Sequence, residues 1–225
     1  MKIGILQTGH AIDILRRELG DYDAMFARLL DGHGFTFETW NVVDEDYPDR
    51  PSEADGWLIT GSKHGAYEDH PWIPPLEQFI RDIYDAGRPL VGVCFGHQII
   101  AQALGGKVVK FPGGWAIGRT VYDIEGQKIA LNAWHQDQVV SLPEGAQVIG
   151  SNDFCANAAL LYGNRIYTIQ PHPEFGAHII GRLIEHRGPG VVPDTQLAQA
   201  QTRLDAPVAN DVIGRRIAEF FKQER

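Results

Sequence analysis

Cys94 lies between a short apolar segment and a helical one, and its sulfur is a candidate nucleophile. Residues 90–93 form an apolar run with two valines, which predicts a buried strand, and apolar residues recur at helical spacing over 99–104. Gly92 and Gly96 flank the cysteine and complete the G-x-C-x-G pattern of a nucleophile elbow. A sharp turn crowds its own backbone, so the flanking positions favour residues without a Cβ. The N-terminus of the following helix favours a thiolate.

His172 and Glu174 supply the base that a cysteine nucleophile requires. They follow a strand expected over residues 166–169, and residues two apart in extended backbone point to the same side. Prolines on both sides of His172 restrict the backbone to extended conformations. The carboxylate can then orient the imidazole, so Cys94, His172 and Glu174 form a predicted catalytic triad. The alternative interpretation of Cys94 is a buried, inert cysteine, and that of His172 and Glu174 is a turn on the protein surface.

Backbone N–H groups are also needed to bind the oxyanion of an acyl-transfer reaction. The N–H of Phe95 directly follows the nucleophile and is one candidate. Gly61 or Ser62, at the end of a strand expected over residues 55–61, is the other, because glycine allows close approach of the backbone to a ligand.

The loop over residues 63–75 is either a binding element or a solvated connector, and the sequence favours neither. It follows a predicted strand and contains polar and aromatic residues, namely His64, Tyr67, His70 and Trp72. Together with His10, its histidines show no recognisable spacing of metal ligands. We therefore expect no metal site.

Composition excludes several classes of protein. The chain has 225 residues and a net charge of −9, which disfavours nucleic acid and anionic membranes as partners. No apolar run approaches the roughly 20 residues that span a bilayer. The N-terminus enters a predicted strand without a signal-peptide pattern, so we expect a cytoplasmic protein. In that reducing compartment the two cysteines, Cys94 and Cys155, are expected to be free thiols.

The order of predicted elements indicates an α/β fold. In the first half, strands alternate with helices, which favours a parallel sheet covered on both faces. Short strands then follow with glycine turns between them, which predicts an antiparallel excursion at the sheet edge. The expected strands are 2–7, 35–43, 55–61, 90–93, 107–111, 119–124, 127–131, 147–151, 158–162 and 166–169. The expected helices are 21–32, 76–86, 95–104, 176–187, 195–204 and 208–222, and residues 11–20 give a mixed pattern.

Two motifs in combination carry a resemblance to a family. The stretch Gly92-Val-Cys94-Phe-Gly96-His-Gln98, followed by Pro171-His172-Pro-Glu174, resembles the class I (triad) glutamine amidotransferases. The Phe-Gly-His-Gln version, with Gly61-Ser62, is similar to stand-alone members such as guanosine monophosphate synthetase-like amidotransferases and plant γ-glutamyl peptidases. The resemblance covers about residues 3–187. It implies one domain over residues 1–225, a three-layer, flavodoxin-like, mostly parallel sheet, and a C-terminal helical extension at about 190–225.

The resemblance also implies roles for individual residues. Cys94 matches the nucleophile, His172 the general base and acid, and Glu174 the residue that orients it. The oxyanion positions match Gly61 and Phe95, and no cofactor is implied. The substrate-binding positions match Ser62, Gln98, Trp134, His135, Gln136 and Asp137. Trp134 and Gln136 replace smaller residues of the family pattern, which disfavours plain glutamine as the preferred substrate. Trp134 and the long loop over residues 63–75 together favour a substrate larger than glutamine.

Three functions remain open. The first is a self-sufficient hydrolase that cleaves the γ-amide of glutamine, or of another γ-glutamyl compound, through a γ-glutamyl thioester. The second is a subunit that delivers ammonia to a synthetase, which must be a separate chain because only about forty residues follow Arg187. The third, a catalytically inactive binding protein, is disfavoured by the intact triad. The sequence indicates no oligomeric state.

Overall fold

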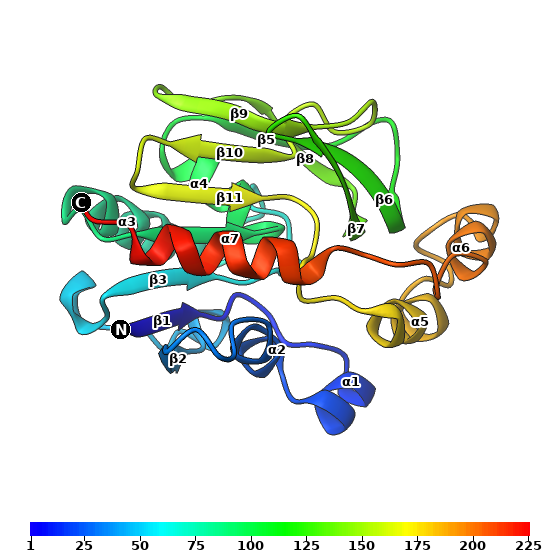
Figure 1. Cartoon of the computed structure of the whole chain (residues 1–225), viewed down its shortest axis with the longest axis horizontal. Helices are drawn as coiled ribbons and strands as arrows, with labels where there is room; N and C mark the ends of the chain where they lie inside the picture. Colours follow the sequence, from blue (N-terminus) through cyan, green and yellow to red (C-terminus); the bar gives the residue numbers. More distant parts are fainter.

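A computed structural model describes residues 1–225, and its strands and helices alternate along the first part of the chain (Figure 1). The strands are β1 (Lys2–Leu6), β2 (Thr36–Trp40), β3 (Gly56–Ile59), β4 (Leu90–Val93), β5 (Lys107–Lys110), β6 (Ala116–Ile124), β7 (Gln127–His135), β8 (Asp137–Ser141), β9 (Ala146–Ser151), β10 (Ala159–Tyr162) and β11 (Ile166–Ile169). The helices are α1 (Asp13–Leu19), α2 (Tyr22–Leu29), α3 (Ile73–Asp85), α4 (Phe95–Ala103), α5 (Ala177–His186), α6 (Asp194–Gln201) and α7 (Asn210–Lys222). Short 3-10 helices occupy Val42–Asp44 and Pro51–Glu53.

One nine-stranded sheet organises the molecule, in the order β2-β1-β3-β4-β11-β10-β9-β6-β7. The strands β2, β1, β3, β4 and β11 run parallel, and each later neighbour pairs antiparallel. This arrangement confirms the predicted α/β class. The carboxyl ends of the parallel strands lie together at the right of Figure 1, the edge where such sheets bind ligands.

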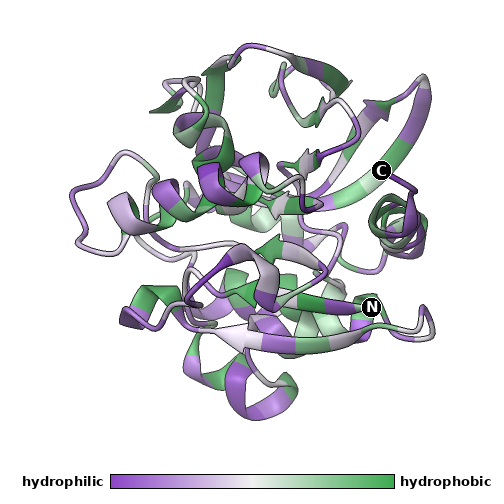
Figure 2. Cartoon of the chain, turned by 90° about the vertical axis from the view of Figure 1, so that its left-hand side faces the viewer, coloured by the Kyte–Doolittle hydropathy of each residue, from purple (hydrophilic) through white to green (hydrophobic).

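Helices cover both faces of the parallel strands. On β3, Trp57 and Ile59 pack into one core cluster with α3 and α4, while Leu58 packs into a second cluster with α2 and α7. Successive side chains of a strand point to opposite faces, so a strand covered on both sides must be apolar throughout. Figure 2 shows hydrophobic segments along the central strands and hydrophilic segments on the outer parts of the helices and loops.

The C-terminal segment contributes to this core. Ile213, Ile217 and Phe221 of α7 are buried in the cluster that covers the second face. Burying one such side chain contributes about 1.5–3 kcal/mol. Helix α7 therefore forms part of the packed layer, whereas α6 packs against α5 and β6.

The antiparallel part differs from its expected shape. It continues the main sheet through four strands, and β5 and β8 form a separate two-stranded sheet. β7 runs on to His135, four residues beyond the expected end, because it pairs with β6 along its whole length. The expected strand at 35–43 ends at Trp40, where a 3-10 turn over Val42–Asp44 follows. None of the helices combines the length and apolarity needed to cross a membrane.

Candidate active site

Cys94 sits at the apex of a sharp turn between β4 and α4. Its φ of 54° lies in the region that disfavours side chains, and its ψ is −104°. A Cβ on Gly92 would come within 2.5 Å of the Gly96 carbonyl oxygen, and a Cβ on Gly96 within 2.3 Å of the Ile59 carbonyl oxygen. Both glycines are therefore required by close backbone approach, as the sequence pattern indicates.

The strain at Cys94 leads to a stability prediction. We expect Cys94→Gly to be about 1 kcal/mol more stable than Cys94→Ala, because glycine adopts a positive φ without a steric cost. Both variants lack the thiol, so the difference between them isolates the backbone. Urea unfolding of the two variants measures it. A Cys94→Gly variant that is less stable than Cys94→Ala by about 0.4–1 kcal/mol, the entropic cost of glycine at an unstrained position, would show that position 94 carries no strain.

His172 and Glu174 lie behind the cysteine as a connected pair. Nδ1 of His172 is 2.7 Å from Oε1 of Glu174, and both side chains are buried. The backbone N–H of His172 donates to the Asn132 carbonyl at 2.8 Å, which ties the segment to β7. The imidazole also stacks on the ring of Phe175, with centroids 4.0 Å apart and planes 1° apart. The imidazole is therefore held in one orientation by contacts on its edge and its face.

The surroundings of His172 favour its protonated form. Burial opposes the charge, but the carboxylate of Glu174 and the hydrogen-bonded sulfur of Cys94 outweigh it and raise the pKa of His172 to about 10. The structure thus brings the three predicted triad residues into one chain of contacts, from Cys94 through His172 to Glu174.

Gly61 and Phe95 lie on either side of the cysteine. A Cβ on Gly61 would be 3.0 Å from Cε1 of His172 and 3.7 Å from the Cβ of Cys94. The carbonyl of Gly61 accepts hydrogen bonds from the hydroxyls of Thr8 and Thr60, which fixes the orientation of this segment. Phe95 is the first residue of α4, where helical N–H groups have no intrahelical carbonyl to bind.

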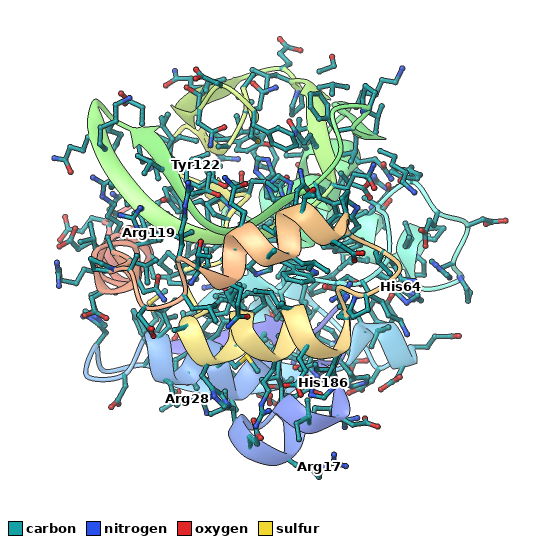
Figure 3. All side chains as sticks on the ribbon, turned by 90° about the vertical axis from the view of Figure 1, so that its right-hand side faces the viewer. Arg17, Arg28, His64, Arg119, Tyr122 and His186 are labelled. Atoms are coloured by element: carbon teal, nitrogen blue, oxygen red, sulfur yellow. The ribbon has the colours of Figure 1, made fainter.

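A pocket of about 140 Å³ opens beside Cys94. It brings together the six residues predicted to bind substrate, Ser62, Gln98, Trp134, His135, Gln136 and Asp137. The loop between β3 and α3 lines it as well, through Lys63, His64, Gly65, Tyr67 and Glu68. In Figure 3, which faces the side of the molecule that carries α5 and α6, His64 lies on this same side. The loop is therefore part of the pocket and not only a connector.

The predicted substrate-binding residues differ in whether their polar side-chain atoms already have hydrogen-bond partners within the protein. The side-chain amide of Gln98 donates to the Asp137 carbonyl and to Oε1 of Gln170, at 2.9 and 3.1 Å. Trp134 and His135 instead each have a buried ring nitrogen without a hydrogen-bond partner in the protein. Burial and the nearby His172 lower the pKa of His135 to about 3, so its imidazole is neutral.

Asp137 links the loop to the floor of the pocket. Its Oδ1 accepts a hydrogen bond from the Tyr67 hydroxyl at 3.2 Å. Burial raises the pKa of the Asp137 carboxyl, although the Tyr67 hydroxyl and Lys110 counteract this effect. The contact places the loop directly over the segment that the sequence predicts to bind substrate.

Sequence reasoning missed three residues that line the pocket. They are Lys110 at the end of β5, Trp115 just before β6 and Arg187 just after α5. None belongs to a motif, and they meet only because three distant segments converge at one edge of the sheet. Lys110 and Arg187, together with Lys63, add positive charge to a pocket that also contains Glu68 and Asp137.

Comparison with known proteins identifies the family. The family described as glutamine amidotransferase class-I matches residues 29–184, which include the elbow and the His172–Glu174 pair. The chain belongs to the class-I glutamine amidotransferase family. A putative glutamine amidotransferase-like protein of Schizosaccharomyces pombe is 32% identical over 97% of this chain and 98% of its own length.

Other members of the family have more specific names. Gamma-glutamyl peptidase 4 of Arabidopsis thaliana is 29% identical over 77% of this chain and 75% of its own length. A glutamine-hydrolysing GMP synthase of Clostridium novyi is 31% identical over 73% of this chain but only 34% of its own length. The chain thus corresponds to one part of that longer enzyme.

A solved structure of the same family supports the fold. A glutamine amidotransferase of Thermotoga maritima superposes with a TM-score of 0.76 at 22% identity, and the match covers 98% of this chain and 99% of that one. At this identity the similarity establishes the architecture, which confirms the flavodoxin-like three-layer fold.

Proposed function

We propose that this chain hydrolyses the γ-amide bond of glutamine or of another γ-glutamyl compound through a thioester on Cys94. The observation that carries the proposal is the contact chain Cys94–His172–Glu174 at the apex of a strained elbow, beside an open pocket. Family membership and the similarity to γ-glutamyl peptidases support the same reaction class.

In the first half of the reaction, the Cys94 thiolate attacks the γ-carbonyl carbon. The carbonyl oxygen becomes an oxyanion, which accepts hydrogen bonds from the N–H groups of Phe95 and Gly61. Protonated His172 donates its Nε2 proton to the departing nitrogen, the C–N bond breaks, and ammonia or an amine leaves. Glu174 keeps the imidazole oriented and stabilises its charge.

In the second half, water replaces the leaving group. His172, now neutral, accepts a proton from the water, whose oxygen attacks the thioester carbon. The C–S bond breaks, glutamate leaves and the thiolate–imidazolium pair is restored. The reaction consumes no reactant other than the γ-glutamyl substrate and water.

The pocket is proposed to hold the γ-glutamyl group through Ser62, Gln98 and residues 134–137. Trp134 and His135 have unpaired ring nitrogens, and Gln98 holds the backbone of Asp137 in place. The additional cations Lys63, Lys110 and Arg187 favour a leaving group that carries a carboxylate, as a γ-glutamyl peptide does.

Glutamate release from the purified chain tests this proposal. We expect a γ-glutamyl dipeptide to give a higher kcat/KM than glutamine, because only the peptide presents a carboxylate to the outer cations. Cys94→Ala serves as the control for contaminating activity. Release that is equal in the control would contradict the proposal.

The second candidate is a subunit that delivers ammonia to a separate synthetase chain. The match to one part of a GMP synthase favours it. Negligible turnover of every substrate, together with covalent labelling of Cys94 by a glutamine-like electrophile, would support this candidate over the self-sufficient hydrolase.

A further inference from the structure

The loop between β3 and α3 brings three potential metal ligands together at the rim of the pocket. His64, Glu68 and His70 each offer one ligand atom, and these atoms all lie within 4.8 Å of one another. Oε2 of Glu68 is 2.8 Å from Nε2 of His70 and 3.4 Å from Nδ1 of His64. The histidine spacing considered in the sequence leaves out Glu68, which the turn of the loop places between the two imidazoles.

The separations are close to those of a metal coordination shell. Ligand atoms at 2.0–2.2 Å from a tetrahedral zinc ion are about 3.3–3.6 Å from each other. The distance of 3.4 Å from the Glu68 carboxylate to His64 lies within this range, and the distance of 2.8 Å to His70 is shorter than the range. Small side-chain rotations would therefore place all three atoms around one ion. Two imidazoles and one carboxylate are also a donor set that zinc accepts, with a fourth position left for water.

The surrounding contacts hold these side chains in place before any ion binds. The rings of His64 and His70 are 4.2 Å apart at their centroids, and His70 stacks on Trp72 with planes 14° apart. Trp72 is buried and its ring lies 5.5 Å from that of Phe95, so it anchors the loop to the core.

The backbone of the loop supports the same arrangement. The N–H of Glu68 donates to the Gly65 carbonyl at 3.0 Å, and the N–H of His70 donates to the Glu68 carbonyl at 3.1 Å. The short turn formed by these bonds directs the three ligands to one point. A preorganised donor set loses less conformational entropy when it binds an ion.

We propose that His64, Glu68 and His70 form a binding site for one divalent transition-metal ion, with zinc as the best match to the donors. The site lies at the rim of the pocket, because His64 and Glu68 line the same cavity as Cys94. The bound ion would fasten the loop that covers Asp137. This site is separate from the thioester chemistry, and neither proposal depends on the other.

Calorimetric titration of the full, metal-free chain with Zn²⁺ tests the proposal. The titration uses a Cys94→Ala background, because a catalytic thiol can itself bind zinc. We expect one ion per chain with a micromolar or lower Kd. Glu68→Gln, which preserves the shape of the side chain, and His70→Ala should each weaken binding by about 10-fold or more.

His33→Ala is the matched control. His33 lies in the turn before β2, at the opposite end of the parallel strands, so its removal should leave the Kd unchanged. Co²⁺ provides a second readout, since four-coordinate Co²⁺ absorbs strongly in the visible range and Glu68→Gln should reduce that absorption at a Co²⁺ concentration near the wild-type Kd. Millimolar binding, or a Kd that neither Glu68→Gln nor His70→Ala changes, would overturn the proposal.

Discussion

Cys94→Ala is expected to lower kcat for glutamate release by about 10⁴-fold or more, because no other group can form the thioester. The substitution removes the sulfur that contacts His172 and leaves the proposed oxyanion donors, the N–H groups of Gly61 and Phe95, in place. Steady-state kinetics with glutamine and a γ-glutamyl dipeptide measure the effect.

The fold of this variant should be retained. Alanine keeps the Cβ, and Cys94 is only 5% exposed with no disulfide to lose. The near-UV circular dichroism and the thermal unfolding of the variant therefore serve as controls. Hydrolysis at the wild-type rate by a folded Cys94→Ala variant would refute the assignment of the nucleophile.

Glu174→Gln is expected to lower kcat by about 10²–10⁴-fold. Acid–base catalysis by a correctly protonated group such as His172 usually contributes a factor of this size, and His172 depends on Glu174 for its protonation. The wild-type carboxylate helps to raise the pKa of His172 to about 10, so His172 keeps its proton throughout the neutral range. Without that negative charge, burial is opposed only by Cys94 and the pKa of His172 falls. The proton is then lost at a lower pH, and the alkaline limb of the pH–rate profile should move to lower pH.

Glu38→Gln is a matched control for this change. Glu38 is an exposed carboxylate on the edge strand β2 that pairs with Lys2 at 2.7 Å, away from the central strands β4 and β11 that precede the proposed triad residues. Its replacement should leave both kcat and the pH profile unchanged. A Glu174→Gln variant with a reduced kcat but an unshifted alkaline limb would show that Glu174 only supports the packing around His172.

The chemistry of the elbow was accessible from sequence because it is a local feature. Gly92, Cys94 and Gly96 lie within five residues, and the two glycines follow from a steric requirement of one turn. The pair His172 and Glu174 is also local, but the structure joins the two differently from the expected extended backbone. Pro173 and Glu174 form a turn, in which the N–H of Phe175 donates to the His172 carbonyl at 3.3 Å. The alternation of apolar strands and amphipathic helices similarly predicted the α/β class. The spacing of apolar residues within each segment is enough to identify that segment as a strand or a helix.

The pocket could be predicted only in part. Residues 134–137 were predicted from the resemblance, but their placement depends on the pairing of β7 with β6, which carries the strand to His135. Lys110, Trp115 and Arg187 come from three separate segments and have no shared pattern. Their meeting depends on how β5, β6 and α5 pack.

By itself, the sequence determined the parallel strand–helix order, the elbow around Cys94 and the pairing of His172 with Glu174. Each of these features depends on residues that are close together along the chain. Only the tertiary structure decided the cation-rich rim of the pocket and the grouping of His64, Glu68 and His70. Loop conformation is set by long-range contacts, such as Trp72 on Phe95 and Tyr67 on Asp137, and these contacts leave no periodic signal in the sequence.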